Sequence, residues 1–473
     1  MTPGEHWAGL VTGRRVLVAG AGVTGRSVAA ALVAMGAEVT VTDANADRLA
    51  ELADTGAALV PGLAEPPPGT DLVVTSPGWH PTSPLLVAAA TAGVEVIGEI
   101  ELAWRMSARL PEPPAWLVVT GTNGKTTTVC MLESILKAAG LNAVACGNVG
   151  LPVVDAIRAG HEVLAVELSS FQLHWQSSLR AEASVVLNVA EDHLDWHGSL
   201  EEYARAKGRA HNGAKTVVHN LADEWSTRLA AEHDGTRVGF GLGVPRPGEL
   251  GLVEDLLVDR ALVADPANAA EELAALADVR PAGPHNVANA LAAAALARAH
   301  GVPPEAVREG LRAFVPGAHR AVPVGAVDGV EFVNDSKATN PHAAAGSLLA
   351  FGSVVWVAGG QLKGASVDDL VQRVAGRLRG VVLLGADAGV FAASLARHAP
   401  DVPVERVAPG DDEAMIAAVR AAGAMARSGD VVLLAPAAAS LDMYANYAHR
   451  GDAFVAAVDR WRGERDSGPA GGR

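Results

Sequence analysis

The sequence predicts an α/β protein of three domains, each built on a mostly parallel sheet. With 473 residues, the chain is too long for a single hydrophobic core. Short apolar segments that end in glycine or polar turns alternate with helix-like stretches, as in doubly wound sheets. Two proline-containing segments, at 110–114 and 314–318, interrupt this pattern. We therefore expect domains at 1–111, 112–316 and 317–473.

The first block predicts a Rossmann-like βαβ unit. An apolar strand is followed by Gly20, Gly22 and Gly25, by an apolar helix over 27–35, and by a second strand that ends at Asp43. Taken alone, this pattern suggests a dinucleotide site with Asp43 on a ribose, so a nicotinamide or flavin cofactor stays open at this point. The strands are expected from residue 15, over 38–42 and over 71–76.

The second block opens on a phosphate-binding loop, Gly121-Thr-Asn-Gly124-Lys125-Thr126. Its glycines let backbone N–H groups converge on a polyphosphate, its lysine supplies positive charge, and its threonine hydroxyl can reach Mg²⁺. The loop is a compressed form of the eight-residue pattern, because Val119 stands where a glycine is usual. It predicts the use of a nucleoside triphosphate.

Two later strands of this block deliver polar side chains to the same edge. A strand over 162–166 is followed by Glu167, and a strand over 183–189 leads into Glu-Asp-His193. Ligands gather at the carboxyl ends of parallel strands. Glu167 and His193 are therefore expected to face the same phosphates as Lys125.

The remaining elements complete the expected α/β architecture. A stretch over 234–264 rich in Gly, Val and Pro predicts a small β insertion, and a helix is expected over 284–298. Four strands that each end in a polar or glycine turn predict a second open doubly wound sheet in the third block, over 330–333, 354–357, 380–384 and 431–434. The polar tail from Arg462 onward is expected to be disordered.

Composition narrows the class of protein. A net charge of −16 argues against nucleic acid as a partner, because phosphate backbones select basic surfaces. The start lacks a signal-peptide pattern, and apolar runs such as 291–297 are too short to cross a bilayer. We expect a cytoplasmic enzyme that does not bind membranes. Cys130 and Cys146 are too few for a disulfide framework or a thiolate metal site, so both are expected to be ordinary buried thiols.

Five motifs occur in order along the chain: Gly121-Thr-Asn-Gly-Lys-Thr-Thr, Glu167-Leu-Ser-Ser-Phe-Gln-Leu, Asn188-Val-Ala-Glu-Asp-His-Leu-Asp, Asn334-Asp-Ser-Lys-Ala-Thr-Asn and Ser440-Leu-Asp. Together they resemble the Mur ligases of peptidoglycan synthesis. The fourth motif narrows the resemblance to the members that add D-glutamate, since the sister ligases and folylpolyglutamate synthases differ there.

The resemblance implies a division of labour among the three domains. The N-terminal Rossmann-like domain would bind the UDP-sugar, the central one would be a P-loop ATPase, and the C-terminal Rossmann-like one would close over ATP. The first glycine turn would then hold the UDP pyrophosphate, and no redox cofactor is expected. The implied reaction joins D-glutamate to UDP-N-acetylmuramoyl-L-alanine through an acyl phosphate, in a monomeric enzyme.

The resemblance also implies two Mg²⁺ ions. Thr126 and Glu167 would hold the first ion, and His193 with a carbamylated Lys207 would hold the second. Lys125 would stabilise charge on the phosphates, so Lys125, His193 and Lys207 are the expected catalytic residues. Without the resemblance, Lys207 is typical of a solvated helix lysine, and its assignment depends on analogy.

The other site residues are carried over by the same resemblance. ATP is expected at Gly121, Thr122, Asn123, Gly124, Lys125, Thr126, Thr127, Asn286, Asn289, Arg320, Asp335 and Lys337. The UDP substrate is expected at Gly22, Val23, Thr24, Asp43, Ser76, Pro77, Gly78 and Asn148. D-Glutamate is expected at Thr339, Lys363, Ser440, Leu441 and Tyr447. The three-residue spacing of the two helical asparagines equally suits polar groups on a helix surface.

Two other interpretations compete with this one. The first is a different ligase of the same superfamily, such as a folylpolyglutamate synthase or another amino-acid-adding Mur enzyme, and residues 334–340 argue against it. The second is a regulator that binds nucleotides without catalysis. Loss of Lys125, Glu167 or His193 would favour the regulator, and all three are present.

Overall fold

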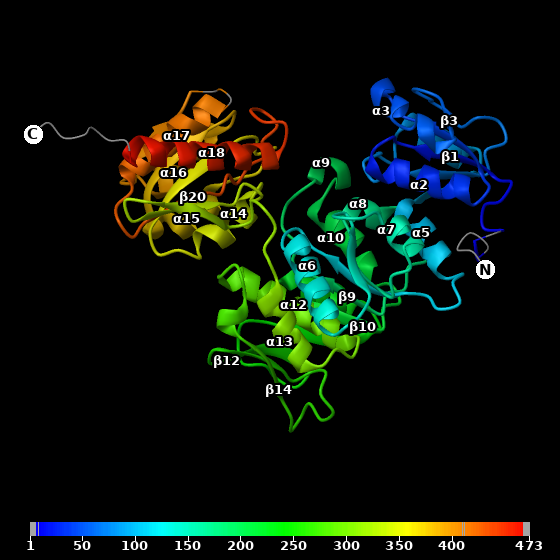
Figure 1. Cartoon of the computed structure of the whole chain (residues 1–473), viewed down its shortest axis with the longest axis horizontal. Coiled ribbons are helices and arrows are strands. Elements are labelled where there is room, and N and C mark those ends of the chain that lie inside the picture. The colour runs from blue at the N-terminus through cyan, green and yellow to red at the C-terminus, as the bar shows by residue number, and fades with distance from the viewer. Residues whose placement is uncertain (1–5, 8, 409, 411, 467–473) are drawn as a thin grey trace, which may run out of the picture. The chain divides into compact units, whose positions relative to one another are not determined.

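The computed structural model describes residues 6–7, 9–408, 410 and 412–466. It contains three sheets of five, nine and six strands, flanked by helices (Figure 1). Contacts within the chain form two compact units. One comprises residues 1–279 and 288–314 and holds the first two sheets, and the other comprises 280–287 and 315–473 and holds the third.

The first sheet is fully parallel, with strand order β3-β2-β1-β4-β5. This order is that of a dinucleotide-binding half, as the glycine pattern predicts. Its strands are β1 (Arg15–Ala19), β2 (Glu38–Thr42), β3 (Ala58–Leu59), β4 (Leu72–Thr75) and β5 (Glu95–Gly98), and its helices are α2 (Val23–Ala34), α3 (Ala46–Ala50), α4 (Pro84–Thr91) and α5 (Glu99–Ser107). The helix expected over 27–35 begins earlier, at Val23, because Gly22 caps it directly after the glycine turn.

The central sheet has the order β14-β13-β12-β11-β10-β9-β6-β8-β7 and is parallel from β7 to β12. Its strands are β6 (Ala115–Thr120), β7 (Ala143–Gly147), β8 (Val163–Glu167), β9 (Ala183–Val186), β10 (Thr216–Asn220), β11 (Thr236–Phe240), β12 (Glu249–Val253), β13 (Leu256–Asp259) and β14 (Glu271–Ala275). Its helices are α6 (Lys125–Ala138), α7 (Val153–Arg158), α8 (Ser170–His174), α9 (Leu194–His197), α10 (Leu200–Gly208), α11 (Glu224–Ala231), α12 (Pro284–Ala299) and α13 (Pro304–Ala313).

The expected β insertion over 234–264 is β-structured but is not a separate element. Strands β11, β12 and β13 continue the central sheet outward from β10, and only the last two pairings are antiparallel. The apolar residues of this stretch extend the existing core, since Val238, Phe240, Leu250 and Leu257 are all buried.

The third sheet has the order β15-β16-β20-β17-β18-β19, parallel except for the edge strand β15. Its strands are β15 (Val322–Val327), β16 (Val330–Asn334), β17 (Val354–Gly359), β18 (Leu378–Leu384), β19 (Val404–Arg406) and β20 (Val431–Leu434), and its helices are α14 (Pro341–Leu348), α15 (Asp368–Val374), α16 (Ala388–His398), α17 (Asp412–Met425) and α18 (Tyr447–Asp466). The sequence predicted four of the six strands and missed the two edge strands, since β19 is exposed throughout and β15 is interrupted by Pro323 and Gly325.

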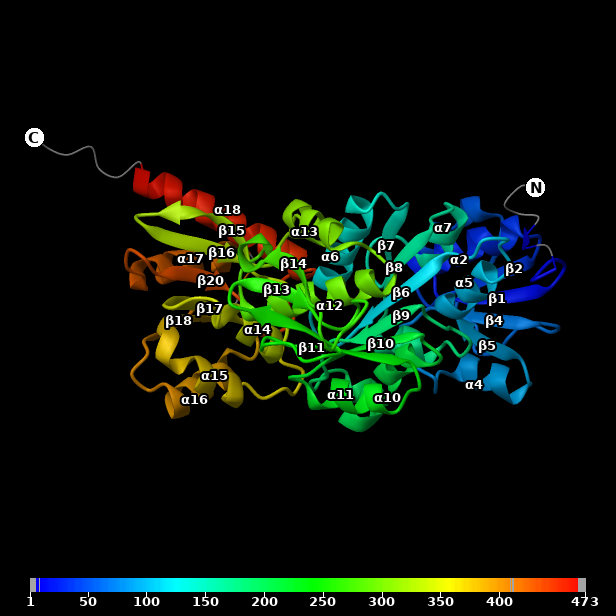
Figure 2. The same cartoon turned by 90° about the horizontal axis from the view of Figure 1, so that it is seen from below.

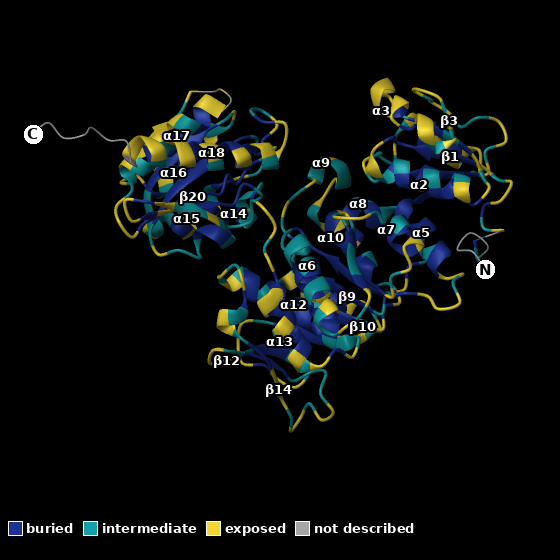
Figure 3. Ribbon diagram, in the orientation of Figure 1, coloured by how far each residue is buried: buried dark blue, intermediate teal, exposed yellow. Residues whose placement is uncertain are grey.

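Side-chain alternation along the strands gives the third sheet a core on each face. Trp356 packs with α14, α15 and α16, whereas its neighbours Val355 and Val357 pack with α17 and α18. Figure 2 shows these helices on opposite sides of the sheet, and Figure 3 shows the buried strands between them. The tail expected to be disordered from Arg462 is helical up to Asp466, so the prediction was wrong for those residues. Residues 467–473 lie outside the described part of the chain.

Helix α5 fastens the first sheet to the central one. The Glu99 carboxylate accepts a hydrogen bond of 3.0 Å from the Val154 N–H at the start of α7. Glu101 accepts bonds of 2.8 and 2.9 Å from the Ser177 and Ser178 N–H groups. Burial raises the pKa of Glu99 to about 7, against the effect of its backbone hydrogen bonds. The carboxyl ends of the two sheets are thereby kept in one body.

The central core also buries an imidazole. His211 is 1% exposed, and its Nδ1 lies 2.7 Å from the Ser184 hydroxyl. Its Nε2 is buried without a hydrogen-bond partner among the described residues. Burial, aided by the neighbouring His233 and His219, lowers the pKa of His211 to about 3. This ring is therefore neutral in the folded protein throughout the neutral and mildly acidic range.

We expect stability to fall as the pH drops below about 6.5, where the unfolded chain protonates His211 and the folded chain does not. This side chain alone should cost about 2 kcal/mol of unfolding free energy between pH 7.5 and 5.0. The measurement is denaturant unfolding at both pH values. In His211→Gln the difference between the two pH values should shrink by that amount. An unchanged difference would contradict the buried neutral imidazole.

Candidate active site

The phosphate-binding loop joins β6 to the N-terminus of α6, which has no side-chain cap. Gly121 and Gly124 have φ angles of 153° and 86°, which side-chain-bearing residues rarely adopt. The first turn of α6 holds no acidic residue. Its positive dipole end thus suits an anion. Thr126 and Thr127 lie in this first turn, and Thr122 and Asn123 lie in the loop.

Asn188, which follows β9, braces this loop. Its backbone carbonyl accepts from the Thr122 N–H at 2.9 Å, and its side chain exchanges hydrogen bonds of 2.9 and 3.1 Å with the Asn123 backbone. From α12, Asn289 lies so close to Gly124 that a Cβ there would stand 2.4 Å from its Oδ1. Both asparagines of α12, Asn286 and Asn289, are buried, so neither is a surface group.

Two lysines converge on one carbonyl oxygen of the loop. The Lys125 ammonium donates to the Gly121 and Thr122 carbonyls at 2.8 and 2.9 Å. The Lys207 amine, from α10, donates to the Gly121 carbonyl at 2.8 Å and lies 4.3 Å from the centre of the Tyr203 ring. Lys207 is 1% exposed, which excludes the solvated helix lysine. Burial lowers its pKa well below the ordinary value, and Lys125 lowers it further.

Glu167 ends β8 beside these lysines and carries an unsatisfied oxygen. The side chain is 1% exposed, and its Oε1 accepts from the Asn148 amide at 2.8 Å. Its Oε2 is buried without a hydrogen-bond partner in the described structure. A buried carboxylate oxygen without a partner is costly unless a cation or donor binds it. Glu167 therefore fits a metal ligand.

The residues present fit a Mg²⁺ ion that is shared with a bound phosphate. Among the described residues, no group of three or more His, Cys, Asp or Glu side chains is placed to hold a metal ion. Mg²⁺ is usually held by one or two carboxylates together with phosphate oxygens and water. The unsatisfied Glu167 Oε2 and the hydroxyl of Thr126, at the start of α6, suit that mode.

His193 starts the short helix α9 in a left-handed conformation, with φ of 53°. Its ring is 42% exposed, lies with Nε2 3.6 Å from Asp192, and contacts the edge of Phe171 at a centroid distance of 4.8 Å. The centroid of its ring also lies 6.3 Å from that of Tyr203, whose ring contacts the Lys207 amine. The structure thus brings His193, Glu167 and Lys207 to the edge that holds the phosphate-binding loop.

The first sheet has a second edge that suits an anion. Helix α2 begins at Val23 after the N-cap Gly22, without a side-chain cap or an acidic residue in its first turn, and Val23 is 75% exposed. Asp43 fixes the turn, since its carboxylate accepts from the Ala21 and Asn45 N–H groups at 2.8 and 2.9 Å. Thr24 follows on α2. Ser76 after β4 has a buried hydroxyl without a partner in the described structure, and Pro77 and Gly78 follow it.

In the third domain the loops after β16, β17 and β20 meet through a buried arginine that the sequence did not reveal. Arg450 of α18 is fully buried and donates to the Ser336 hydroxyl at 3.0 Å, the Ser336 carbonyl at 2.9 Å and the Ala438 carbonyl at 3.1 Å. Burial lowers its pKa to about 10. Its position in a helix of mixed polarity gave no signal that it would be buried.

The five residues expected at D-glutamate lie around this arginine-linked edge. Thr339 and Ser440 belong to loops joined by the Ala437 N–H to Ala338 carbonyl bond, and Leu441 is 64% exposed. Lys363 follows β17 in an exposed left-handed turn with φ of 53°. Tyr447 begins α18, where the Lys337 ammonium lies 3.9 Å from its ring centre.

Asp335 makes structural contacts in addition to any contact with a ligand. Its carboxyl group is buried, accepts from the Ala321 N–H at 3.1 Å, and receives the Ser347 hydroxyl. Burial raises its pKa to about 7, against the effects of Ser347, Ala321 and the Arg320 charge. Asp335 therefore fixes the segment that carries Arg320.

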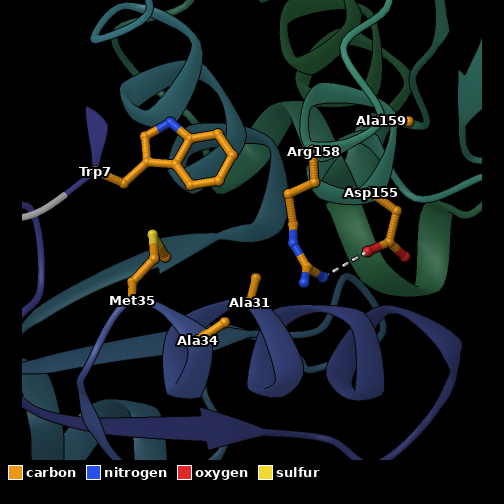
Figure 4. Close-up of a pocket in the computed structure, with 7 residues that line it drawn as sticks. All are labelled: Trp7, Ala31, Ala34, Met35, Asp155, Arg158 and Ala159. Atoms are coloured by element: carbon orange, nitrogen blue, oxygen red, sulfur yellow. Dashed lines mark hydrogen bonds and ion pairs between the residues drawn. The ribbon is translucent and has the colours of Figure 1, made fainter. Parts of the chain in front are cut away.

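A cavity of about 410 Å³ lies away from these residues, between the far end of α2 and α7 (Figure 4). Trp7, Ala31, Ala34 and Met35 form one wall, and the other carries the ion pair of Asp155 with Arg158. None of the candidate site residues lines it.

In the described part of the chain, no helix is long and apolar enough to cross a membrane.

Three family models match consecutive parts of the chain. They are the Mur ligase MurD-like N-terminal domain over 14–98, the Mur ligase middle domain over 119–297, and the Mur ligase glutamate ligase domain over 319–438. The matched ranges contain the two edges that suit an anion and most of the loops joined by Arg450.

Curated relatives match nearly the whole chain. A protein of Thermobifida fusca, named UDP-N-acetylmuramoylalanine--D-glutamate ligase, is 57% identical over 94% of this chain and 98% of its own. A protein of Streptomyces avermitilis with the same name is 56% identical, with the same coverage.

Solved structures of lower identity share the fold. MurF from Acinetobacter baumannii has a TM-score of 0.59 at 18% identity and matches 97% of this chain and 93% of its own. The UDP-N-acetylmuramate-alanine ligase of Thermotoga maritima has a TM-score of 0.57 at 20% identity, over 95% and 99% of the two chains. The three-domain α/β architecture predicted from the sequence is thus confirmed.

The Asn188 brace predicts a mutational effect on nucleotide binding. Asn188→Ala would remove the side-chain acceptor of the Asn123 N–H in the loop, so we expect the affinity for an ATP analogue to fall about tenfold. Calorimetric titration measures it. Asn142→Ala, which removes a surface hydrogen bond to Gly160, is the matched control and should bind as the wild type does. Equal affinities of the two variants would contradict the role given to Asn188.

Proposed function

The chain belongs to the Mur ligase family, and from this premise we propose that it joins D-glutamate to the L-alanine carboxylate of UDP-N-acetylmuramoyl-L-alanine at the cost of ATP. The observation that carries the proposal is the convergence of Lys125, Lys207 and the unsatisfied Glu167 carboxylate on one phosphate-binding loop. The names of relatives that are 57% and 56% identical support the choice of D-glutamate. The product is a precursor of peptidoglycan.

The chemistry requires activation of a carboxylate before an amine can react with it. An oxygen of the L-alanine carboxylate attacks the γ-phosphorus of ATP, ADP leaves, and an acyl phosphate forms. The D-glutamate amine then attacks the acyl carbon, loses a proton and displaces phosphate. Both steps gather negative charge in one place, so the site must supply cations and donors.

The central domain supplies these groups at the phosphate-binding loop. Lys125 lies over the loop carbonyls, within reach of phosphates seated on the N-terminus of α6. Thr126 and Glu167 would hold one Mg²⁺, and His193 with Lys207 would hold a second. Bound Mg²⁺ neutralises phosphate charge and polarises the phosphoryl group.

Lys207 can serve as a ligand only if its charge is changed. Its lowered pKa favours the neutral amine, which is the form that adds carbon dioxide to give a carbamate. A carbamate would replace a positive charge beside Lys125 with a negative one. We therefore propose that Lys207 is carbamylated in the working enzyme.

The two flanking domains, together with three asparagines of the central domain, are assigned to the rest of the substrates. We assign the UDP part to the α2 N-terminus with Gly22, Val23, Thr24, Asp43, Ser76, Pro77 and Gly78, and the alanyl end to Asn148. Asn286, Asn289, Arg320, Asp335 and Lys337 are assigned to ATP. Thr339, Lys363, Ser440, Leu441 and Tyr447 are assigned to D-glutamate, whose two carboxylates need an ammonium and hydroxyl donors.

The remaining parts of the proposal concern organisation. We propose domain boundaries at 1–111, 112–316 and 317–473, each range holding one sheet. We further propose that the enzyme is a monomer. ATP and a UDP-sugar are cytoplasmic metabolites, so we place the reaction in the cytoplasm.

Phosphate release from ATP tests the function directly. With UDP-N-acetylmuramoyl-L-alanine present, we expect release to depend on D-glutamate and to be far slower with L-glutamate, L-lysine or meso-diaminopimelate. Equal rates with another amino acid would move the chain to a sister ligase activity. No release with any of them, from a folded protein that binds ATP, would refute a ligase.

Removal of the Lys125 charge should slow the chemical step. Lys125→Ala is expected to lower kcat by about 10² to 10³, the scale for losing one strong electrostatic group. Thermal stability should stay near that of the wild type. Lys137→Ala, an exposed lysine at the other end of α6, is the matched control and should retain full turnover. A Lys125→Ala enzyme with wild-type turnover at saturating ATP would exclude the assigned role.

The carbamate proposal predicts a chemical rescue. Lys207→Ala should be severely slowed, and acetate should partly restore its activity by placing a carboxylate in the vacated space. The rescue should saturate with acetate and be absent from the wild type, which has no such space. Full activity of Lys207→Ala would show that the second ion, if present, is held by other residues.

A further inference from the structure

The turn that carries His193 is anchored by a residue outside the assigned site. His193 has a positive φ, and its carbonyl accepts from the Trp196 and His197 N–H groups at 3.1 Å each. Its ring is 42% exposed, so burial alone does not fix the direction of the side chain. A single left-handed residue is held in place only when its surroundings impose that conformation. The far end of the turn, at His197, provides such contacts.

His197 binds the segment that begins with Glu167. Its Nε2 lies 2.9 Å from the hydroxyl of Ser170, which is buried and stands three residues after Glu167. Its ring lies parallel to Phe171, with 3° between the planes and 5.7 Å between the centroids. The same Phe171 contacts the His193 ring at 4.8 Å. One imidazole thus joins the segments that follow β8 and β9.

His197 also supports the helix that carries Lys207. Its ring lies 5.2 Å from the Tyr203 ring, and the Lys207 amine lies 4.3 Å from the centre of that same ring. The Tyr203 hydroxyl in turn lies 3.3 Å from the Thr122 hydroxyl in the phosphate-binding loop. A displacement of His197 would therefore disturb its contacts with Ser170, Phe171 and Tyr203 together.

We infer that His197 is a positioning residue that sets the spacing of Glu167, His193 and Lys207, three of the four side chains proposed to hold Mg²⁺. It acts through Ser170, Phe171 and Tyr203 and does not itself touch the phosphates. This inference rests on the proposed function. Residues that orient metal ligands from behind commonly change metal affinity or activity by about 10- to 100-fold when they are replaced.

Two substitutions each remove the hydrogen bond of the imidazole and keep an aromatic ring at position 197. His197→Phe keeps a flat ring against Phe171 and Tyr203 but removes the hydrogen bond to Ser170. Ser170→Ala removes the same bond from the other side, and serves if His197→Phe does not fold. His161→Gln is the matched control, since His161 makes a comparable ring-nitrogen contact with Asn142 at 2.8 Å elsewhere on the central domain.

Metal binding is measured first, without turnover. Mn²⁺ is titrated by electron paramagnetic resonance into each protein with a non-hydrolysable ATP analogue and UDP-N-acetylmuramoyl-L-alanine. We expect about tenfold weaker Mn²⁺ binding in His197→Phe and in Ser170→Ala, and no change in His161→Gln. The double variant should be no weaker than His197→Phe alone, because both changes remove one hydrogen bond.

Steady-state kinetics and thermal unfolding complete the test. The two variants should need about tenfold more Mg²⁺ for half-maximal rate and show a lower kcat, with the KM for ATP within about twofold of the wild type. Wild-type Mn²⁺ affinity in both variants, or additive losses in the double variant, would overturn the inference. If the wild type itself shows no D-glutamate-dependent phosphate release, the proposed function fails instead, so the two failures are distinguishable.

Discussion

The central site depends on the meeting of two amines at the carbonyl oxygen of Gly121. Lys125 and Lys207 both donate to this atom, and Lys207 is buried. Burial lowers the pKa of Lys207, and the nearby Lys125 charge lowers it further. The arrangement becomes favourable only when negative charge is added. The unsatisfied Glu167 oxygen, bound phosphates and a carbamate on Lys207 are the groups that can supply it or balance it.

The scaffold explains why these groups are near one another. The phosphate-binding loop, Glu167 and the His193 turn follow β6, β8 and β9, which are neighbours in the central sheet. Carboxyl ends of adjacent parallel strands share one edge, so distant parts of the sequence meet without long loops. The third domain uses the same geometry, and Arg450 holds two of its loops together.

Local sequence patterns were enough to predict most buried strands of the three sheets, the glycine turns and the placement of Glu167 and His193 after β-strands. Contacts between distant segments were not predictable in this way. Asn188 stands 65 residues from the loop it braces, and Arg450 lies 114 residues from Ser336. No local sequence pattern marks His197, because its contacts are with Ser170 and Tyr203, which lie on other segments. Edge strands such as β19 also escaped prediction, since exposed strands carry no apolar run.

Helix α5 holds the first sheet to the central one, and this limits which fragments of the protein can be expressed separately. Glu101 is 1% exposed and is bound by N–H groups 76 and 77 residues further along the chain, in the central domain. A fragment that ended after α5 would expose this carboxylate and the apolar surface around it without those partners. The first domain is therefore a poor choice for separate expression. The first compact unit, which contains both sheets, keeps the Glu101 carboxylate together with the N–H groups that bind it.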